Sequence, residues 1–275
     1  MRQFIADSFP DADGLLKVEG KKARHLVQVL RSSPGDMIYV RLPDGFVQEM
    51  TVASVDSGRK SLLLQVAGPD YAEGIQSPRA NMAAPRAQTF GPELWLFQFV
   101  AKPPKMDLII RQAAECGVRH IVPVEGTFCQ SGPVDSARKR TENGDKRWER
   151  IITEAREQSG SPVATEVHPC MNLPHALDLW NTMPGDTSLA LVLYEQTKGT
   201  VALHTATENS KVERAALFVG AEGGISPEEI SYMQGRGVKP VHLPTNILRC
   251  ETAAVYGMAA MQTALAEKEL WQLKG

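Results

Sequence analysis

Runs of apolar residues alternate with amphipathic segments over the C-terminal part of the chain. Apolar strands are expected at 94–100, 120–124, 163–168, 188–194, 215–219 and 238–243, and helices at 107–116, 146–158, 174–180, 227–235 and 251–270. Buried strands that alternate with helices are typical of a parallel sheet covered by helices. The pattern therefore predicts an α/β fold for this part of the chain.

The N-terminal part has a different pattern. Short β-type runs at 37–42, 46–55 and 61–66 are separated by turns rich in Asp and Gly. A single helix is predicted at 21–31, with an apolar face formed by Ala23, Leu26, Val27 and Leu30. Its other face carries Lys21, Arg24, Gln28 and Arg31. This basic face suits either a phosphate backbone or simple exposure to solvent.

A weakly patterned stretch separates the two parts. It contains Pro69, Pro78, Pro85 and Pro92 together with three glycines, which is typical of a linker. The sequence thus predicts a small β-rich domain at 1–72, a linker at 73–92 and an α/β domain at 93–275.

Composition narrows the class of protein. Of 275 residues, 43% are hydrophobic and 23% are charged, which is a globular balance. No apolar run approaches the roughly 18 residues that span a bilayer, and the start lacks a signal-peptide pattern. The cysteines form no CxxC pair and the histidines show no HxxxH spacing, so no metal site is expected. We expect a cytoplasmic protein with free thiols and no membrane partner.

Charge is unevenly distributed along the chain, although the net charge is only −2. Residues 76–150 carry 12 basic and 8 acidic side chains, whereas residues 151–275 carry 9 and 14. A polyanion would therefore bind a local patch rather than the whole surface. The alternative is that these charges form ordinary solvated faces.

Three loops follow apolar strands, at 194–196, 220–224 and 244–249. In open α/β sheets ligands bind at the carboxyl ends of the strands, so these loops are expected to form one site. The second loop has three glycines and leads into Ser226 and Glu229, which have the spacing of a capping box. The loop matches neither the Walker motif nor the GxGxxG motif, and the negative charge of Glu222 would repel a phosphate. A ligand with a hydroxyl or a positive charge fits it better, unless the loop is only a tight connection.

The third loop ends in Arg249, Cys250 and Glu251 at a strand-to-helix junction. An arginine beside a pocket suits an anion or a base edge, although both charges are also compatible with a plain helix start. The final helix carries a stripe of small residues, namely Ala253, Gly257, Ala260 and Ala264. This stripe fits either a dimer contact or tight packing within one chain.

Five ordered motifs resemble the RsmE family. They are the segment 25–31, the group Lys102, Lys105-Met106, Gln112-Ala113 and Glu115-Cys116-Gly117, the group Trp148, Glu154-Ala155 and 157–160, and the loops 218–226 and 247–253. The family consists of SPOUT-class RNA methyltransferases that modify N3 of a uridine in small-subunit (16S) ribosomal RNA. The resemblance covers nearly the whole chain.

The resemblance implies a fold and a cofactor. The fold is an N-terminal PUA-like β-barrel followed by a SPOUT α/β domain with a C-terminal trefoil knot, assembled as a homodimer. The cofactor is S-adenosylmethionine, and the residues implied to bind it are Tyr194, Gly220, Ala221, Glu222, Gly223, Gly224, Leu243, Asn246, Ile247, Leu248, Thr252 and Ala253. Lys21, Arg24, Arg31, Lys102 and Lys105 are implied to hold RNA phosphates.

Two residues are expected to act on the uracil. N3 must lose its proton before it can attack the methyl group, so the developing negative charge needs a stabiliser. Arg249 is expected to stabilise the uracil oxygens. Glu251 would either accept the proton or orient Arg249, and orientation is favoured because pairing with an arginine weakens a carboxylate as a base.

Three positions depart from the family pattern. Ala221 stands where the family usually has Pro, Pro244 where it has Gly, and Ser161 where it has Arg. A proline fixes φ in the third loop, and the loss of an arginine weakens contact with RNA. The alternative to methylation of this uridine is therefore a non-catalytic or retargeted RNA-binding protein of the same fold. A small-molecule enzyme that uses a nucleotide is a third option, weakened by the lack of a phosphate loop.

Overall fold

The computed structural model describes residues 3–56, 58, 61–67, 91–142, 146–183, 187–208 and 212–272. The chain divides into two compact units, Met1–Gln88 with Glu157–Gly160, and Thr89–Arg156 with Ser161–Gly275. Most of the predicted linker at 73–92 lies outside the described residues. No helix in the described part of the chain is long and apolar enough to cross a membrane.

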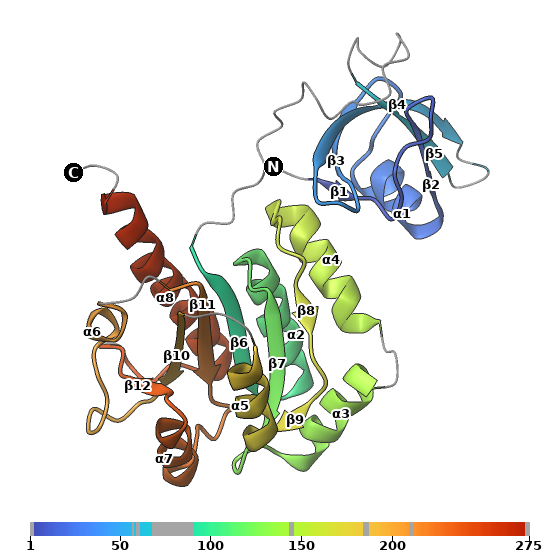
Figure 1. Cartoon of the computed structure of the whole chain (residues 1–275). Helices are drawn as coiled ribbons and strands as arrows, with labels where there is room; N and C mark the ends of the chain where they lie inside the picture. Colours follow the sequence, from blue (N-terminus) through green and yellow to red (C-terminus); the bar gives the residue numbers. More distant parts are fainter. Residues whose placement is uncertain are drawn as a thin grey trace. The chain divides into compact units, whose positions relative to one another are not determined.

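The first unit is built on a curled five-stranded sheet in the order β1-β3-β4-β5-β2 (Figure 1). The strands are β1 (Phe4–Ile5), β2 (Leu15–Glu19), β3 (Met37–Arg41), β4 (Val47–Asp56) and β5 (Ser61–Val66). Its pairs are antiparallel except for β1 with β3. Val40, Met50 and Leu64 are fully buried inside the curl. The β-rich prediction is confirmed, but β1 and β2 were not predicted, because β1 has only two residues and β2 only five.

The predicted helix at 21–31 is shorter than expected. It consists of α1 (Gly20–Arg24), which continues into a π-helical turn, η1 (His25–Val29). Ala23 and Leu26 are buried as predicted, whereas Leu30 is exposed. The basic positions of the predicted other face, Lys21, Arg24 and Arg31, are exposed. Arg31 lies beyond the helix in a left-handed conformation, with φ of 58°.

The second unit contains a parallel sheet in the order β12-β10-β11-β6-β7-β8, with β9 paired to β7. The strands are β6 (Glu93–Phe99), β7 (His120–Glu125), β8 (Glu166–Val167), β9 (Met171–Asn172), β10 (Ser188–Leu193), β11 (Arg214–Val219) and β12 (Lys239–Val241). The pairs along this order and the pair of β9 with β7 are parallel, which confirms the predicted α/β fold. The strand expected at 163–168 is reduced to the two residues of β8.

The helices of this unit connect the strands. They are α2 (Pro103–Glu115), α3 (Ser131–Glu142), α4 (Arg147–Ser159), α5 (Leu173–Thr182), α6 (Leu203–Thr207), α7 (Pro227–Gly235) and α8 (Cys250–Gln272). The helices α3 and α6 were not predicted, because α3 buries only Val134 and Ala137 and α6 is only five residues long.

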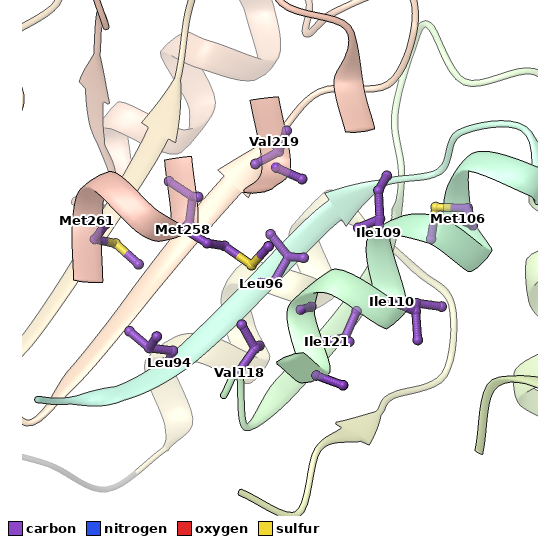
Figure 2. Packing of buried hydrophobic residues seen from close by; sticks show 14 of the residues in the cluster. Leu94, Leu96, Met106, Ile109, Ile110, Val118, Ile121, Val219, Met258 and Met261 are labelled. Carbon is purple, nitrogen blue, oxygen red and sulfur yellow. The ribbon is translucent and has the colours of Figure 1, made fainter. Parts of the chain in front are cut away.

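Helices cover both faces of the sheet, because successive side chains of each strand point to opposite faces. Leu94 and Leu96 of β6 pack in the cluster with α2 and α8 (Figure 2). Trp95, Phe97 and Phe99 of the same strand pack in a second cluster with α5 and α7. Such two-sided burial explains why these strands read as almost continuous apolar runs.

The last helix approaches the sheet very closely. A Cβ atom on Gly257 would lie 2.6 Å from Leu193 Cδ1 and 2.9 Å from Leu217 Cδ2. At this position the stripe of small residues therefore serves packing within one chain. After β12 at the edge of the sheet, the chain returns to its middle, where α8 contacts α2 and β11. This return is the segment in which the resemblance implies the trefoil knot.

Candidate functional site

The three predicted loops meet at the carboxyl edge of the sheet and enclose a cavity of about 530 Å³. The loops follow β10, β11 and β12, which lie next to one another in the sheet in the order β12-β10-β11. Of the predicted cofactor residues, the cavity is lined by Tyr194, Gly220, Ala221, Glu222, Gly223, Gly224, Leu243, Asn246, Ile247, Leu248 and Ala253. Thr252 is not in this lining and is exposed on α8. Ile247 stands at the solvent side, with 88% of its surface exposed.

Several lining residues were not among the predicted cofactor-binding or catalytic residues, although Glu195 and Thr245 lie within the predicted loops. They are Lys105, Leu193, Glu195, Val219, Ile225, Val241, His242, Thr245 and Cys250. Most of them adjoin a predicted residue in the sequence, so the loop argument extended by one position would have found them. Lys105 belongs to α2, and no local sequence signal links it to the loops.

The glycine loop is a tight turn fixed by its own backbone. The amide of Gly224 donates to the carbonyl of Ala221 at 3.0 Å, and Gly224 has a φ of 77°. A Cβ atom on Gly220 would lie 3.0 Å from the backbone carbon of Gly224, so the turn requires a glycine there. The predicted capping box is present, with Ser226 accepting from the amide of Glu229 at 3.2 Å. The loop therefore presents backbone groups at close range to the cavity.

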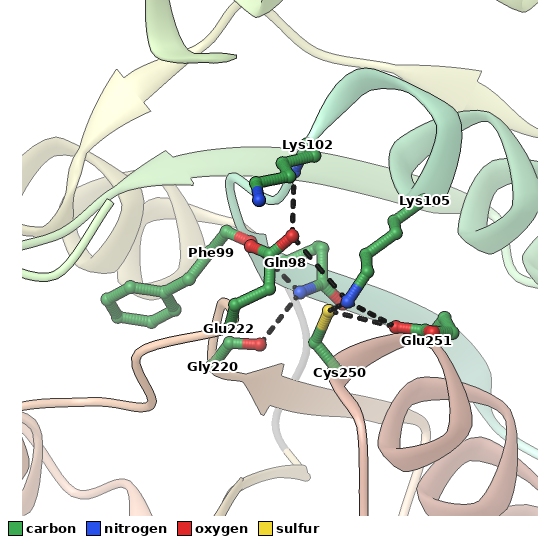
Figure 3. A network of polar contacts seen from close by, with 8 residues as sticks. All are labelled: Gln98, Phe99, Lys102, Lys105, Gly220, Glu222, Cys250 and Glu251. Atoms are coloured by element: carbon green, nitrogen blue, oxygen red, sulfur yellow. Dashed lines mark hydrogen bonds and ion pairs between the residues drawn. The ribbon is translucent and has the colours of Figure 1, made fainter. Parts of the chain in front are cut away.

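Gln98 holds this loop from the neighbouring strand β6. It is fully buried, and its Nε2 donates to the carbonyls of Phe99, Val219 and Gly220 at 2.9, 3.2 and 3.1 Å. Gln98, the one polar residue in the apolar strand predicted at 94–100, is thus explained by these three hydrogen bonds. It ties the end of β11 and the start of the glycine loop to β6 (Figure 3).

An ionic cluster lies beside the pocket, and its members Lys105 and Glu222 line the cavity (Figure 3). The Nζ of Lys105 lies 3.1 Å from Glu251 Oε2 and 3.6 Å from Glu222 Oε1. Glu222 Oε1 also accepts from the backbone amide of Lys102 at 3.2 Å. The hydrogen bond with Glu251 raises the pKa of Lys105 above its usual value. Lys105 therefore remains an ammonium ion between two carboxylates.

Cys250 and Glu251 share this cluster. The thiol of Cys250 donates to Glu251 Oε2 at 3.2 Å, and burial raises its pKa to about 12. Burial alone would raise the pKa of Glu251 as well, but its own backbone amide, Cys250 and Lys105 hold that pKa below its usual value. At neutral pH the cluster thus contains a thiol and a carboxylate, not a nucleophilic thiolate.

The structure differs here from two expectations. Glu251 was expected to orient Arg249, but its partners are Lys105 and Cys250. Lys105 was expected to face RNA phosphates, but its charge is already matched by Glu222 and Glu251. Arg249 lines the cavity, is exposed and forms no ion pair with any residue that the structure describes. Its guanidinium is thus available to a ligand.

The remaining predicted positions are dispersed. Lys102 is exposed at the start of α2, whereas Lys21, Arg24 and Arg31 belong to the first unit. Of the departures, Ala221 is buried in the glycine loop, Pro244 is exposed in the third loop and Ser161 is buried. A buried serine at position 161 does not offer a contact to RNA.

Comparison with known proteins decides the family. The profile of the RNA methyltransferase domain matches residues 90–262, which contain all three loops of the pocket. The chain belongs to the RNA methyltransferase family. The matched domain contains the pocket at the carboxyl edge, and the family predicted from the sequence motifs is confirmed.

Relatives of this RNA methyltransferase cover nearly its full length. The ribosomal RNA small subunit methyltransferase E of Bacillus subtilis is 25% identical over 89% of this chain and 88% of its own length. The Mycobacterium tuberculosis protein of the same name is 25% identical over 94% and 90%. The crystal structure of the Neisseria gonorrhoeae protein of that name, bound to S-adenosyl methionine, has a TM-score of 0.73 and 24% identity, covering 96% of this chain and 97% of that one. The last comparison confirms the fold across both units.

Proposed function

We propose that this methyltransferase transfers a methyl group from S-adenosylmethionine to N3 of a uridine in small-subunit (16S) ribosomal RNA. The observation that carries the proposal is the pocket of three loops in an RNA methyltransferase domain. The names of full-length relatives support the small ribosomal subunit as the source of the RNA. Such a substrate occurs in the cytoplasm, where the enzyme would act.

The residues of the pocket fit this cofactor. The carboxylates of Glu195 and Glu222 complement its positively charged sulfonium and ammonium groups, and Leu243 and Leu248 offer apolar contact to its adenine. The tight glycine turn gives backbone amides and carbonyls access to its polar groups. When bound, S-adenosylmethionine supplies an electrophilic methyl group.

Two side chains near the pocket have different roles in the reaction of the uracil. Arg249 stabilises the negative charge that grows on the uracil oxygens as N3 loses its proton to solvent water. Glu251 keeps Lys105 in place instead of orienting Arg249, because the Lys105 ammonium lies 3.1 Å from its carboxylate. Arg249 is thus the catalytic residue in the proposal, and Glu251 is a positioning residue.

The proposal includes RNA contacts and a second copy of the chain. Lys21, Arg24, Arg31 and Lys102 are exposed and hold phosphates, which positions RNA without reading its sequence. A homodimer is implied by the family resemblance, and Tyr256 on α8 offers an exposed apolar side chain for its interface. Sedimentation at micromolar concentration would test the dimer.

The deciding experiment measures transfer of labelled methyl from S-adenosylmethionine to small ribosomal subunits that lack this modification. The expected product is 3-methyluridine, identified after digestion to nucleosides. Bound cofactor without label in these subunits would indicate another RNA target. Neither label nor bound cofactor would favour a non-catalytic RNA-binding protein of the same fold and overturn the proposal.

A further inference from the structure

The amino edge of the parallel sheet, opposite the pocket, gathers a second group of chemically active side chains. Glu93, His120 and Glu166 are the first residues of β6, β7 and β8. His120 pairs in register with Glu166, and His168 follows two residues later with its amide donating to the carbonyl of Ile121 at 2.9 Å. Residues far apart in the sequence are therefore brought together by the strand order alone.

Three donor atoms of this group converge on one point. His120 Nδ1 lies 2.9 Å from His168 Nε2 and 3.8 Å from Glu166 Oε2. One donor atom from each of the three residues lies within 4.8 Å of the others. Ligands on one tetrahedral zinc ion with bonds of about 2.1 Å lie roughly 3.4 Å apart. Zinc would therefore replace the hydrogen bond between His120 and His168, which lie 2.9 Å apart, and would draw Glu166 closer to His120 than 3.8 Å.

We propose that His120 Nδ1, His168 Nε2 and the carboxylate of Glu166 bind Zn²⁺, with water as the fourth ligand. Two imidazoles and one carboxylate form a donor set that zinc takes up readily, whereas magnesium and calcium prefer oxygen alone. Glu166 extends into solvent, with 61% of its side chain exposed, which gives the ion and its water a way in.

The surroundings of His120 resemble the support that zinc-binding histidines receive in known sites. Its second nitrogen, Nε2, lies 3.8 Å from Glu93 Oε1, and that oxygen accepts from the indole Nε1 of Trp95 at 2.9 Å. The Trp95 ring lies against the imidazole, with centroids 3.9 Å apart. A carboxylate behind a metal-binding histidine fixes its tautomer and its direction by accepting a hydrogen bond, and Glu93 would take this part once its oxygen closes from 3.8 Å to hydrogen-bond distance.

The location gives this site a structural rather than a catalytic purpose. It is formed at the opposite ends of the strands from the loops that line the pocket. Glu166 and His168 frame β8, which has only two residues and ends the described sheet order. A zinc ion would pin this short edge strand to β7. The histidine spacing gave no hint of the site, because its ligands come from separate strands.

The test uses the full chain, stripped of metal with a chelator and titrated with Zn²⁺ in a calorimeter. We expect one bound ion and a higher melting temperature of the chain. His168→Asn should abolish this binding, Glu166→Gln should weaken it at least tenfold, and Glu93→Gln should weaken it about 10–100-fold through the orientation of His120. Replacement by Co²⁺ should give the visible absorption of a tetrahedral site.

The matched control is His175→Asn, because His175 is exposed on α5 and lies outside the cluster. It should bind zinc as tightly as the natural chain. Zinc bound equally by the natural chain and by Glu166→Gln and His168→Asn would assign the ion to other groups such as the cysteines and overturn the proposal. The absence of binding by the folded natural chain would also overturn it. Glu166→Gln changes an exposed side chain, so the test remains decisive if His168→Asn fails to fold.

Discussion

The two edges of one parallel sheet place chemical groups by different means. At the carboxyl edge, loops after β10, β11 and β12 line a cavity with backbone groups and with charged side chains of their own, and Lys105 of α2 joins them. At the amino edge, the strands themselves bring His120 and Glu166 side by side, and Trp95 packs against His120. Loops can adapt to a ligand, whereas strand ends cannot move without breaking the sheet. Substitutions at the carboxyl edge should therefore change activity, and those at the amino edge should change stability.

The largest effect is expected from Trp95→Ala at the amino edge. Trp95 is 2% exposed, and its loss should lower the free energy of unfolding by about 3–5 kcal/mol. Denaturant unfolding would measure this, while cofactor affinity at low temperature should stay within about twofold. Tyr232→Ala on α7, where the ring is 40% exposed, is the control and should cost about 1 kcal/mol or less. A parallel loss of affinity in Trp95→Ala would show that the two edges are coupled.

Arg249→Ala tests the carboxyl edge. Removal of a side chain that stabilises developing charge should lower kcat by about 10²–10³-fold, with the affinity for S-adenosylmethionine and the melting temperature unchanged. Single-turnover methyl transfer and calorimetry would measure both. Arg236→Ala is a suitable control, because Arg236 pairs with Asp178 at 3.0 Å on the surface and does not line the pocket. Retention of most of the turnover by Arg249→Ala would remove this residue from the mechanism.

Gly257→Ala should affect both properties, because Gly257 lies behind the pocket. The added methyl would meet Leu193, which lines the cavity, and overpacking of this kind costs about 1–3 kcal/mol. We expect a lower melting temperature together with a weaker affinity for the cofactor. Thr263→Ala on the exposed side of α8 should change neither by a measurable amount. An unchanged affinity in Gly257→Ala would mean that Leu193 yields without disturbing the pocket.

The smallest effect concerns Asp107 of α2, whose carboxylate accepts from Arg147 Nη2 at 2.6 Å and Trp148 Nε1 at 3.0 Å. Burial alone would raise the pKa of Asp107, but these bonds and Arg140 hold it below the usual 3.8. The carboxylate therefore stabilises the fold above about pH 4, and this contribution is lost as the pH falls through the lowered pKa. Asp107→Asn should have a lower free energy of unfolding at pH 7, and this free energy should change less as the pH is lowered. Identical acid profiles for both proteins would contradict this assignment.

The sequence predicted those parts of the fold and site that depend on local pattern. Strong apolar runs located β10 and β11 to within a residue, and Ser226 with Glu229 located the start of α7. The rule that ligands bind at the carboxyl ends of strands then brought the three loops to one pocket. Short or weakly amphipathic elements, such as α3 and α6, gave too little periodicity to be recognised.

What the sequence left undetermined depends on contacts across long separations. The partner of Glu251 is Lys105, because α2 and α8 pack side by side. The sequence around either residue gives no signal that predicts this pair. The same holds for His120 and His168, which are neighbours only through the pairing of β7 with β8. Arg249 was expected to be the partner of Glu251 because the two are close in sequence. In the folded chain, Lys105 takes that place.

The grip of Gln98 on three carbonyls has a consequence for how a ligand enters. The hydrogen bonds from its amide already fix the end of β11 and the start of the glycine loop. That side of the pocket is preorganised, so binding there loses little conformational entropy. The third loop is different, since Ile247 is 88% exposed and has most of its apolar surface still to bury. The heat capacity change on binding should therefore report mainly on the closing of the third loop, with the glycine loop as a rigid template.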